Sequence, residues 1–166
     1  MRSIRPHLSL ITPVLATFAV LSTSAQAPAA HPDFSGVWVM DTAKTPGPMM
    51  PLAMTYAIEQ RGDTIKIRRD TKSMQGEFSA SMVYGTDGKP WKNSVTQRGM
   101  PVDVSSVLTW EGSTLVITST ISAEGQDIHQ VEKWTLDSTG KMMTADRTVE
   151  AMGQQFATKM VLNKRP

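Results

Sequence analysis

The chain has 166 residues, of which 40% are hydrophobic and 19% are charged, with 17 basic and 15 acidic side chains. It contains no cysteine, which excludes disulfides, thiolate metal sites and a cysteine nucleophile. Two of the basic residues, Arg2 and Arg5, lie in an expected export signal, so the mature chain has 15 residues of each sign. Because a neutral chain without a basic run attracts polyanions weakly, we expect neither nucleic-acid binding nor stable membrane insertion of the mature chain.

The first 25 residues have the layout of a secretory signal peptide. A basic start is followed by an apolar run over 8–21 and by small residues over 22–27. The apolar run is too short to span a bilayer as a helix, although a retained membrane anchor is the alternative interpretation. Cleavage is expected near Ala25, because a cut after Ala27 would leave Pro28 at the new N-terminus. Residues 26–32 then form a linker, and the protein is expected to be periplasmic or secreted.

Beyond the linker, residues 33–166 predict a single domain built almost entirely of strands. Ten runs alternate between apolar and polar side chains, and helical periodicity is almost absent. The prolines of the segment 42–51 exclude a stable helix there. The expected strands are Gly36–Asp41, Met54–Gln60, Asp63–Asp70, Gly76–Tyr84, Trp91–Arg98, Val102–Glu111, Ser113–Ile121, Asp127–Leu136, Met142–Glu150 and Gln155–Asn163.

Short glycine turns join these runs into consecutive antiparallel hairpins. Two-residue loops at 61–62 and at 111–112 carry glycine where a hairpin needs a positive φ. Sequential hairpins without helices to cover a sheet favour an up-and-down antiparallel barrel of eight to ten strands, with two stacked open sheets as the alternative. A barrel of that size can hold a small ligand. The two predicted registers pair Ile58 with Ile65 and Leu108 with Leu115.

The domain opens with Phe34, Gly36 and Trp38, an aromatic residue followed by Gly-x-Trp. This opening resembles the calycin group of ligand-carrying barrels, which includes the lipocalins and the fatty-acid-binding proteins. In lipocalins this tryptophan closes the barrel floor, and an arginine near the end of the last strand packs over it. The resemblance therefore implies that Gly36 and Trp38 help to close the barrel and that Arg165, next to Lys164, covers the tryptophan.

The resemblance extends over most of residues 33–166. The stretch 134–136, with the following turn at 140–141, is similar to small exported bacterial lipocalin-like proteins of unassigned activity. Two features depart from the better-known families. Thr86-Asp87 lacks the tyrosine of the lipocalin central motif, and the proline-rich segment 42–51 cannot form the helix pair of fatty-acid-binding proteins. Carriage of a specific lipid or retinoid therefore does not follow from the resemblance.

The sharpest polar feature of the predicted barrel is a pair of opposite charges on neighbouring strands. Alternation places Glu132 on the same face as Trp134, and it places Arg147 on the matching face of the next strand, with Ile117 nearby. A charge inside a barrel is costly unless its partners are close, so the pair indicates a contact for the polar end of a ligand. The alternatives are a structural ion pair and a register shifted by one residue, which would expose both charges.

Several other side chains lie at strand positions that the alternation predicts to face inward. Arg69 follows two inward isoleucines and is a candidate for holding an anionic head group, although a strand-end arginine also reaches solvent at a barrel rim. Two tyrosines and a tryptophan are expected either to line the lumen or to pack in the core. The predicted ligand-binding set is Glu132, Arg147, Gln130, Trp134, Arg69, Tyr56, Tyr84 and Trp110.

Enzyme signatures are missing from the sequence, and the methionines are scattered as core filling rather than as a copper(I) site. We expect no catalytic residue, no metal and no cofactor. An enzyme of the isomerase or cyclase kind, one alternative, needs a convergent acid–base pair that the sequence does not offer.

The leading hypothesis is an exported, non-enzymatic binding protein, monomeric or weakly dimeric, with a small amphipathic or hydrophobic molecule in its lumen. It predicts a cavity of several hundred Å³. The second hypothesis is a structural or interaction module with a filled barrel and an exposed apolar patch around 46–52.

Overall fold

The computed structural model describes residues 31–45, 47, 50–97, 99–123 and 125–166. The expected signal peptide, the cleavage near Ala25 and residues 26–30 of the expected linker lie outside these residues. The described chain forms one ten-stranded sheet without a helix, so it contains no helix long and apolar enough to cross a membrane. The strands are β1 (Gly36–Met40), β2 (Ala53–Arg61), β3 (Thr64–Ser73), β4 (Gly76–Gly85), β5 (Trp91–Gln97), β6 (Met100–Glu111), β7 (Thr114–Ala123), β8 (Gln126–Leu136), β9 (Met142–Ala151) and β10 (Gln154–Lys164).

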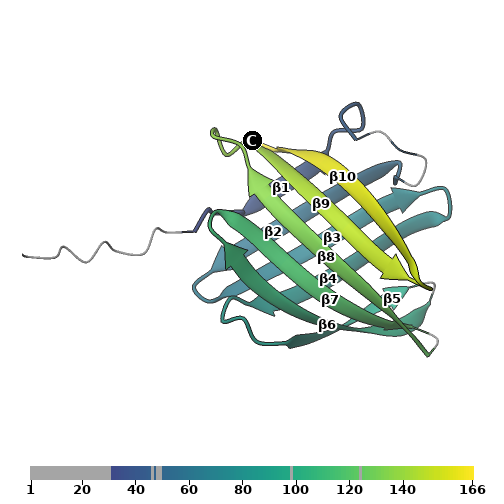
Figure 1. Ribbon diagram of the computed structural model, residues 1–166. Helices are drawn as coiled ribbons and strands as arrows, with labels where there is room; N and C mark the ends of the chain where they lie inside the picture. Colours follow the sequence, from purple (N-terminus) through teal and green to yellow (C-terminus); the bar gives the residue numbers. More distant parts are fainter. Residues whose placement is uncertain (1–30, 46, 48–49, 98, 124) are drawn as a thin grey trace, which may run out of the picture.

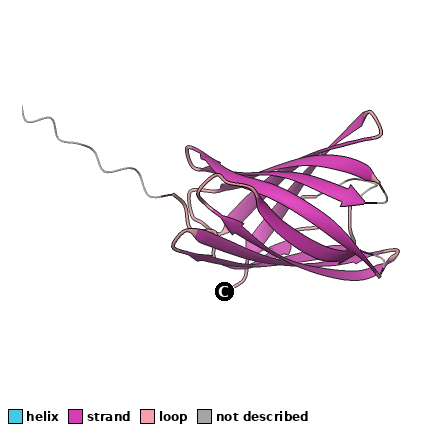
Figure 2. Cartoon of the chain, turned by 90° about the horizontal axis from the view of Figure 1, so that it is seen from below, coloured by secondary structure: helices cyan, strands magenta, loops and turns pink. Residues whose placement is uncertain are grey.

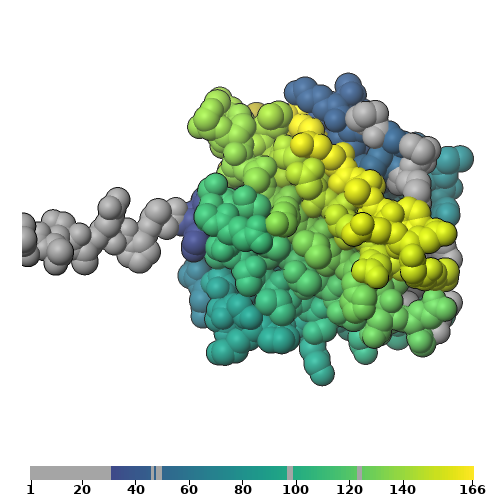
Figure 3. Space-filling view, in the orientation of Figure 1, coloured from purple at the N-terminus to yellow at the C-terminus, as the bar shows by residue number. Residues whose placement is uncertain are grey.

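The strands follow one another around the sheet in an up-and-down barrel, as the sequence predicts. Their order is β4-β3-β2-β1-β10-β9-β8-β7-β6-β5, and each hydrogen-bonded pair is antiparallel. The first and last strands join, because β1 pairs with both β2 and β10 (Figure 1). In the space-filling view the C-terminal strands, coloured green to yellow, cover the wall that faces the viewer (Figure 3).

The barrel is nearly closed rather than fully closed, because the backbone ladder is interrupted between β4 and β5. A side chain bridges this seam. Asn93 Oδ1 accepts a hydrogen bond from the Val83 amide at 2.8 Å, and Asn93 Nδ2 donates to the Val83 carbonyl at 3.0 Å. The indole of Trp91 also lies against Gly85, where a Cβ would come within 2.2 Å of the indole nitrogen. One amide side chain thus replaces two ladder hydrogen bonds.

The alternation of strand directions gives the barrel two distinct ends. At the closed end lie the start of β1, the C-terminus, the β4–β5 connection and the hairpins that follow β2, β6 and β8. At the open end lie the β1–β2 connection and the hairpins that follow β3, β5, β7 and β9. Figure 2 shows the C-terminus at the end of the barrel where the described chain, drawn in pink before β1, begins.

Two predicted hairpin registers are wrong by two residues. Ile58 lies opposite Ile67 rather than Ile65, and Leu108 lies opposite Ile117 rather than Leu115. The loops begin at the glycines, Gly62 and Gly112, whose φ angles are 56° and 61°. A type II′ turn takes its glycine at the first loop position, whereas the prediction had put it second. Because the error is an even number of residues, every side chain keeps its predicted face.

The inward face holds the core, which is densest toward the closed end. The fully buried large side chains come from eight strands and from the segment that precedes β1, and they bury aromatic and aliphatic surface together. The largest are Trp38, Trp134, Tyr56, Phe34, Ile65, Ile67, Leu108, Leu115, Met143, Met160 and Leu162.

Candidate functional site

The lumen contains a cavity of about 610 Å³, a size typical of small-molecule sites. It extends from the buried Trp134 to Met74, a residue of the β3–β4 turn at the open end that is 93% exposed. The filled barrel of the second hypothesis predicts no such space, so the cavity contradicts that part of it. The residues that line the cavity include Tyr56, Arg69, Met82, Tyr84, Ser119, Gln130, Glu132, Trp134 and Arg147.

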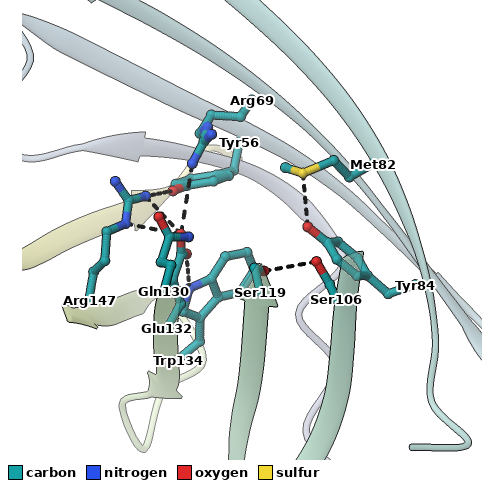
Figure 4. Close-up of polar contacts among 10 residues, drawn as sticks. All are labelled: Tyr56, Arg69, Met82, Tyr84, Ser106, Ser119, Gln130, Glu132, Trp134 and Arg147. Carbon is teal, nitrogen blue, oxygen red and sulfur yellow. Dashed lines mark hydrogen bonds and ion pairs between the residues drawn. The ribbon is translucent and has the colours of Figure 1, made fainter. Parts of the chain in front are cut away.

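Glu132 is the centre of a buried polar cluster on the cavity wall. The predicted pairing with Arg147 is confirmed by the register of β8 and β9, and the Arg147 Nη2 lies 2.9 Å from Glu132 Oε1. The same oxygen accepts a hydrogen bond from Gln130 Nε2 at 2.7 Å, while Oε2 accepts one from the Trp134 indole nitrogen at 2.9 Å. Figure 4 shows these side chains converging on the carboxylate, which is 4% exposed.

The surroundings keep Glu132 ionised despite its burial. Burial alone would raise the pKa of this carboxyl, but the charges of Arg147 and Arg69 and the indole hydrogen bond hold the pKa below its usual value. Arg147 responds in the opposite sense. Burial tends to lower the pKa of its guanidinium, yet the Glu132 charge raises that pKa above its ordinary value. The pair is therefore charged on both sides.

Arg69 gives the cluster more positive than negative charge. Its Nη1 lies 3.8 Å from Glu132 Oε1, farther than the Arg147 guanidinium, and its side chain is 26% exposed. Arg147 Nη2 also donates to the Tyr56 hydroxyl at 3.4 Å. Among the described lining residues the charged ones are two arginines and one glutamate, which leaves one positive charge that no lining carboxylate balances. The cluster can therefore accept an anion.

A second group of polar side chains lies on the wall formed by β4, β6 and β7. The hydroxyls of Ser106 and Ser119 are 2.8 Å apart, and both residues are buried. The Tyr84 hydroxyl donates to the Met82 sulfur at 3.0 Å. Burial, and then the Glu132 charge, raises the pKa of Tyr84, so the phenol stays protonated. Sequence reasoning missed the two serines, although both share the inward parity of their strands.

Of the predicted ligand-binding set, seven side chains line the cavity and one does not. Trp110 is half-buried at the closed end, where it stacks on His31 with ring centroids 4.2 Å apart and packs against Phe34. Its inward parity is as predicted, but it lies near the β6–β7 turn, close to the end of the barrel. Whether the other seven contact a ligand remains a prediction.

The closed end is built around Trp38, as the sequence predicts. The Trp38 indole nitrogen donates to the Phe34 carbonyl at 2.8 Å, and the ring is fully buried. The cation over this ring is Lys164, at 5.2 Å from the centroid, whereas the predicted Arg165 is exposed. The Lys164 side chain also lies over Gly36, where a Cβ would come within 2.6 Å of the lysine Cε and would displace the end of this side chain.

Exposed apolar side chains are found around the open end. Part of the predicted 46–52 patch, residues 46, 48 and 49, lies outside the described residues, but Leu52 is 56% exposed. Met74, Met100 and Met152 lie at or next to three different hairpin turns of this end and are 93%, 48% and 86% exposed. Within the described part of the chain, no group of three or more metal-ligating side chains comes together.

Comparison with known proteins bears on the fold. No family model matches the chain, and no curated protein matches its sequence. Among solved structures, a mutant of the fluorescent protein UnaG aligns over 79% of this chain and 95% of its own, with 13% identity and a TM-score of 0.52. A Schistosoma mansoni fatty-acid-binding protein in complex with arachidonic acid aligns over 80% of this chain and 96% of its own, with 13% identity and a TM-score of 0.50.

The fold is an up-and-down β-barrel like those of these two proteins. The resemblance carried by Phe34, Gly36 and Trp38 is thereby confirmed for the architecture. This barrel differs in one visible respect from the family pattern discussed above, since the described part of the β1–β2 connection contains turns and no helix pair.

Proposed function

We propose that this protein is an exported, non-enzymatic binding protein that holds one small amphipathic molecule in its lumen, with the anionic end of the molecule at Arg69 and Arg147. The observation that carries the proposal is a large lumenal cavity whose described lining includes two arginines and one carboxylate. A buried excess of positive charge favours an anionic group, and the apolar walls favour a hydrocarbon body.

The carboxylate in the cluster has a role in this proposal. Glu132 neutralises Arg147 when the cavity holds no ligand, so that the buried guanidinium keeps a partner. Arg69 is more exposed and farther from Glu132, which leaves it available to a carboxylate or a similar head group. Arginine suits this task because its planar guanidinium forms two parallel hydrogen bonds to such a group.

A matched pair of variants tests the proposal. Arg69→Gln removes the excess charge and leaves the Glu132–Arg147 pair, whereas Arg68→Gln removes the exposed arginine that precedes it on β3. Native mass spectrometry of the protein from its own host, followed by calorimetric titration with saturated fatty acids, should show binding to the wild type and to Arg68→Gln. We expect Arg69→Gln to bind at least tenfold more weakly, the size of a charge-assisted contact.

Two outcomes would contradict the proposal. One is a wild-type protein that carries no small molecule and binds none of the acids, and the other is an Arg69→Gln variant that binds as well as the wild type. The proposed export has its own readout, because the mass of the protein isolated from the host should correspond to a chain that begins near Gln26. A full-length chain in the cell interior would refute export and leave the binding proposal intact.

A further inference from the structure

We propose that Ser119, supported by Ser106 and Tyr84, forms a second polar subsite that receives a hydroxyl or oxo group on the body of the ligand. The inference rests on the proposed function and narrows its ligand class. The cavity would then bind two kinds of anionic amphiphile with different affinity. An amphiphile with a hydroxyl or oxo group partway along its hydrocarbon body would bind more tightly than one without such a group.

The first support is the pattern of the inward face of β6 and β7. Cross-strand pairs on this face are apolar on both sides of the serine pair. Ser106 and Ser119 form one polar pair of neighbours in an otherwise hydrophobic wall, and each is at most 4% exposed. The inward pairs, from the open end to the closed end, are Val104 with Ile121, Ser106 with Ser119, Leu108 with Ile117, and Trp110 with Leu115.

Two hydroxyls in an apolar wall cost free energy, because each loses its hydration on burial, whereas an alanine or valine pair would not. The hydrogen bond between the two serines uses only part of their hydrogen-bonding capacity. Two hydroxyls carry two hydrogens and four lone pairs, and their mutual bond uses one of each. Ser119 lines the cavity and Ser106 does not, so the remaining hydrogen-bonding capacity of Ser119 is within reach of a ligand.

Tyr84 adds a third hydroxyl beside the serine pair. Its phenol donates to the sulfur of Met82, a weak acceptor compared with oxygen, and it also interacts with the Ser106 side chain, which lowers the pKa of Tyr84 slightly against the stronger effect of burial. Tyr84 also lines the cavity and is 3% exposed. A ligand oxygen near Ser119 would offer this phenol a better partner than the sulfur does. Figure 4 shows Tyr84, Ser106 and Ser119 on one side of the close-up, and Arg147 on the other.

The strand register sets the separation between the two polar subsites. Ser119 lies opposite Gln130 on β8, and Gln130 donates to Glu132, which lies opposite Arg147 on β9. Two strand spacings, about 10 Å, and a two-residue offset along β8, about 7 Å, therefore separate Ser119 from Arg147, or roughly 12 Å in all between their Cα positions. The ligand implied by this spacing has an anionic head and an oxygen function near the middle of a long chain or at the far side of a compact ring system.

Two fatty acids of equal length test the subsite. They are octadecanoic acid and octadecanoic acid hydroxylated at its tenth carbon, titrated into the mature protein by calorimetry. The wild type should bind the hydroxylated acid about five- to tenfold more tightly, the size of one well-placed hydrogen bond. Ser119→Ala should lose this preference while it binds octadecanoic acid as the wild type does. The control Thr118→Ala removes an exposed hydroxyl from the outward face of the same strand and should keep the preference.

The possible failures separate the two proposals. Equal binding of both acids to the wild type, or a preference that survives in Ser119→Ala, overturns the subsite and leaves the binding function in place. If the wild type binds neither acid, the subsite and the proposed function both fail. A preference lost together with affinity for the plain acid shows that the serine is structural, which also overturns the subsite.

Discussion

The inward side chains of the closed end and of the open end follow the same alternation, but they fill their halves of the barrel differently. Phe34, Trp38 and Trp134 are at most 1% exposed and leave no room between the strands of the closed end. Toward the open end, smaller or polar side chains such as Ala80 and Ser119 border the cavity instead. Alternation therefore decides which side chains face inward, and their volume decides whether the lumen is filled.

The largest expected effect comes from breaking the charge pair on the cavity wall. Glu132→Ala leaves the Arg147 guanidinium buried without its closest partner, and such a loss costs about 3–5 kcal/mol. Urea unfolding followed by tryptophan fluorescence measures the change. The double variant Glu132→Leu with Arg147→Met should recover most of the lost stability, because it removes both charges.

An exposed ion pair supplies the control for this experiment. Glu111 and Lys133 lie 2.8 Å apart on the outer surface, and Glu111→Ala should change the free energy of unfolding by no more than about 0.5 kcal/mol. If Glu132→Ala and Glu111→Ala lowered the free energy of unfolding equally, the pair in the lumen would be solvated like a surface pair. That result would contradict the proposed difference between the buried and the exposed ion pair.

Acid should weaken the same cluster. Since the pKa of Glu132 is lower in the folded protein than its ordinary value of 4.5, its ionisation stabilises the fold fully above that pH and progressively less as the pH falls through the folded pKa. Glu132→Gln removes this dependence. Unfolding curves collected from about pH 6 to about pH 3 should therefore fall more steeply for the wild type than for the variant; parallel curves would contradict the depressed pKa.

The seam between β4 and β5 is expected to have an intermediate effect. Asn93→Ala removes two hydrogen bonds from the Val83 backbone, and partly buried groups left without partners cost about 1–3 kcal/mol. Hydrogen exchange should accelerate in β4 and β5 and stay unchanged in β9 and β10. Ser94→Ala, an exposed neighbour on β5, is the control. Uniform acceleration of the whole barrel would show that the seam is not an independent weak point.

A smaller change is expected at the closed end. Lys164→Met removes a cation from the face of Trp38 and should cost about 0.5–1 kcal/mol, with a change in the near-ultraviolet circular dichroism of the tryptophan. Arg165→Met should leave both quantities unchanged. The reverse result would restore Arg165 to the covering role that the family resemblance implies.

Filling the cavity should change stability least. Ala80→Leu adds volume to an inward position that borders the cavity and should alter the free energy of unfolding by less than about 1 kcal/mol, while fatty-acid binding weakens because the added side chain occupies ligand space. Ser81→Leu, on the exposed face of the same strand, should leave binding unchanged. A large loss of stability in Ala80→Leu would show that this region is packed like the closed end.

Much of the barrel could be predicted because alternation and turn glycines act locally. All ten strands were expected, and Glu132 faces Arg147 because both lie on long, regular runs. The hairpin registers at Gly62 and Gly112 could not be predicted from composition alone, since glycine fits either the first or the second position of a two-residue loop. The φ angles of the loop residues distinguish these two turn types, and they are known only from the structure.

The remaining errors concern the position of a residue between the two ends of the barrel. The alternation of side chains predicts which residues face inward, but it does not predict this position. Trp110 faces inward as predicted, but it packs at the closed end with His31 and Phe34 and not against the cavity. Ser106 and Ser119 do not stand out in the sequence, because serine is common on exposed faces. Their positions in the alternation, which match those of the inward apolar residues, are the signal that marks them. The choice between Lys164 and Arg165 depends on which residue ends the last strand facing Trp38.

The most direct test of the account compares two indole groups in one sample. Trp134 donates its N–H to Glu132 beside the cavity, and Trp38 donates its N–H to a carbonyl within the closed end. In a proton–nitrogen correlation spectrum, titration with octadecanoic acid should shift the Trp134 indole resonance saturably and leave that of Trp38 in place. A Trp134 resonance that does not move while the acid binds elsewhere would contradict the assignment of the lumen as the binding site.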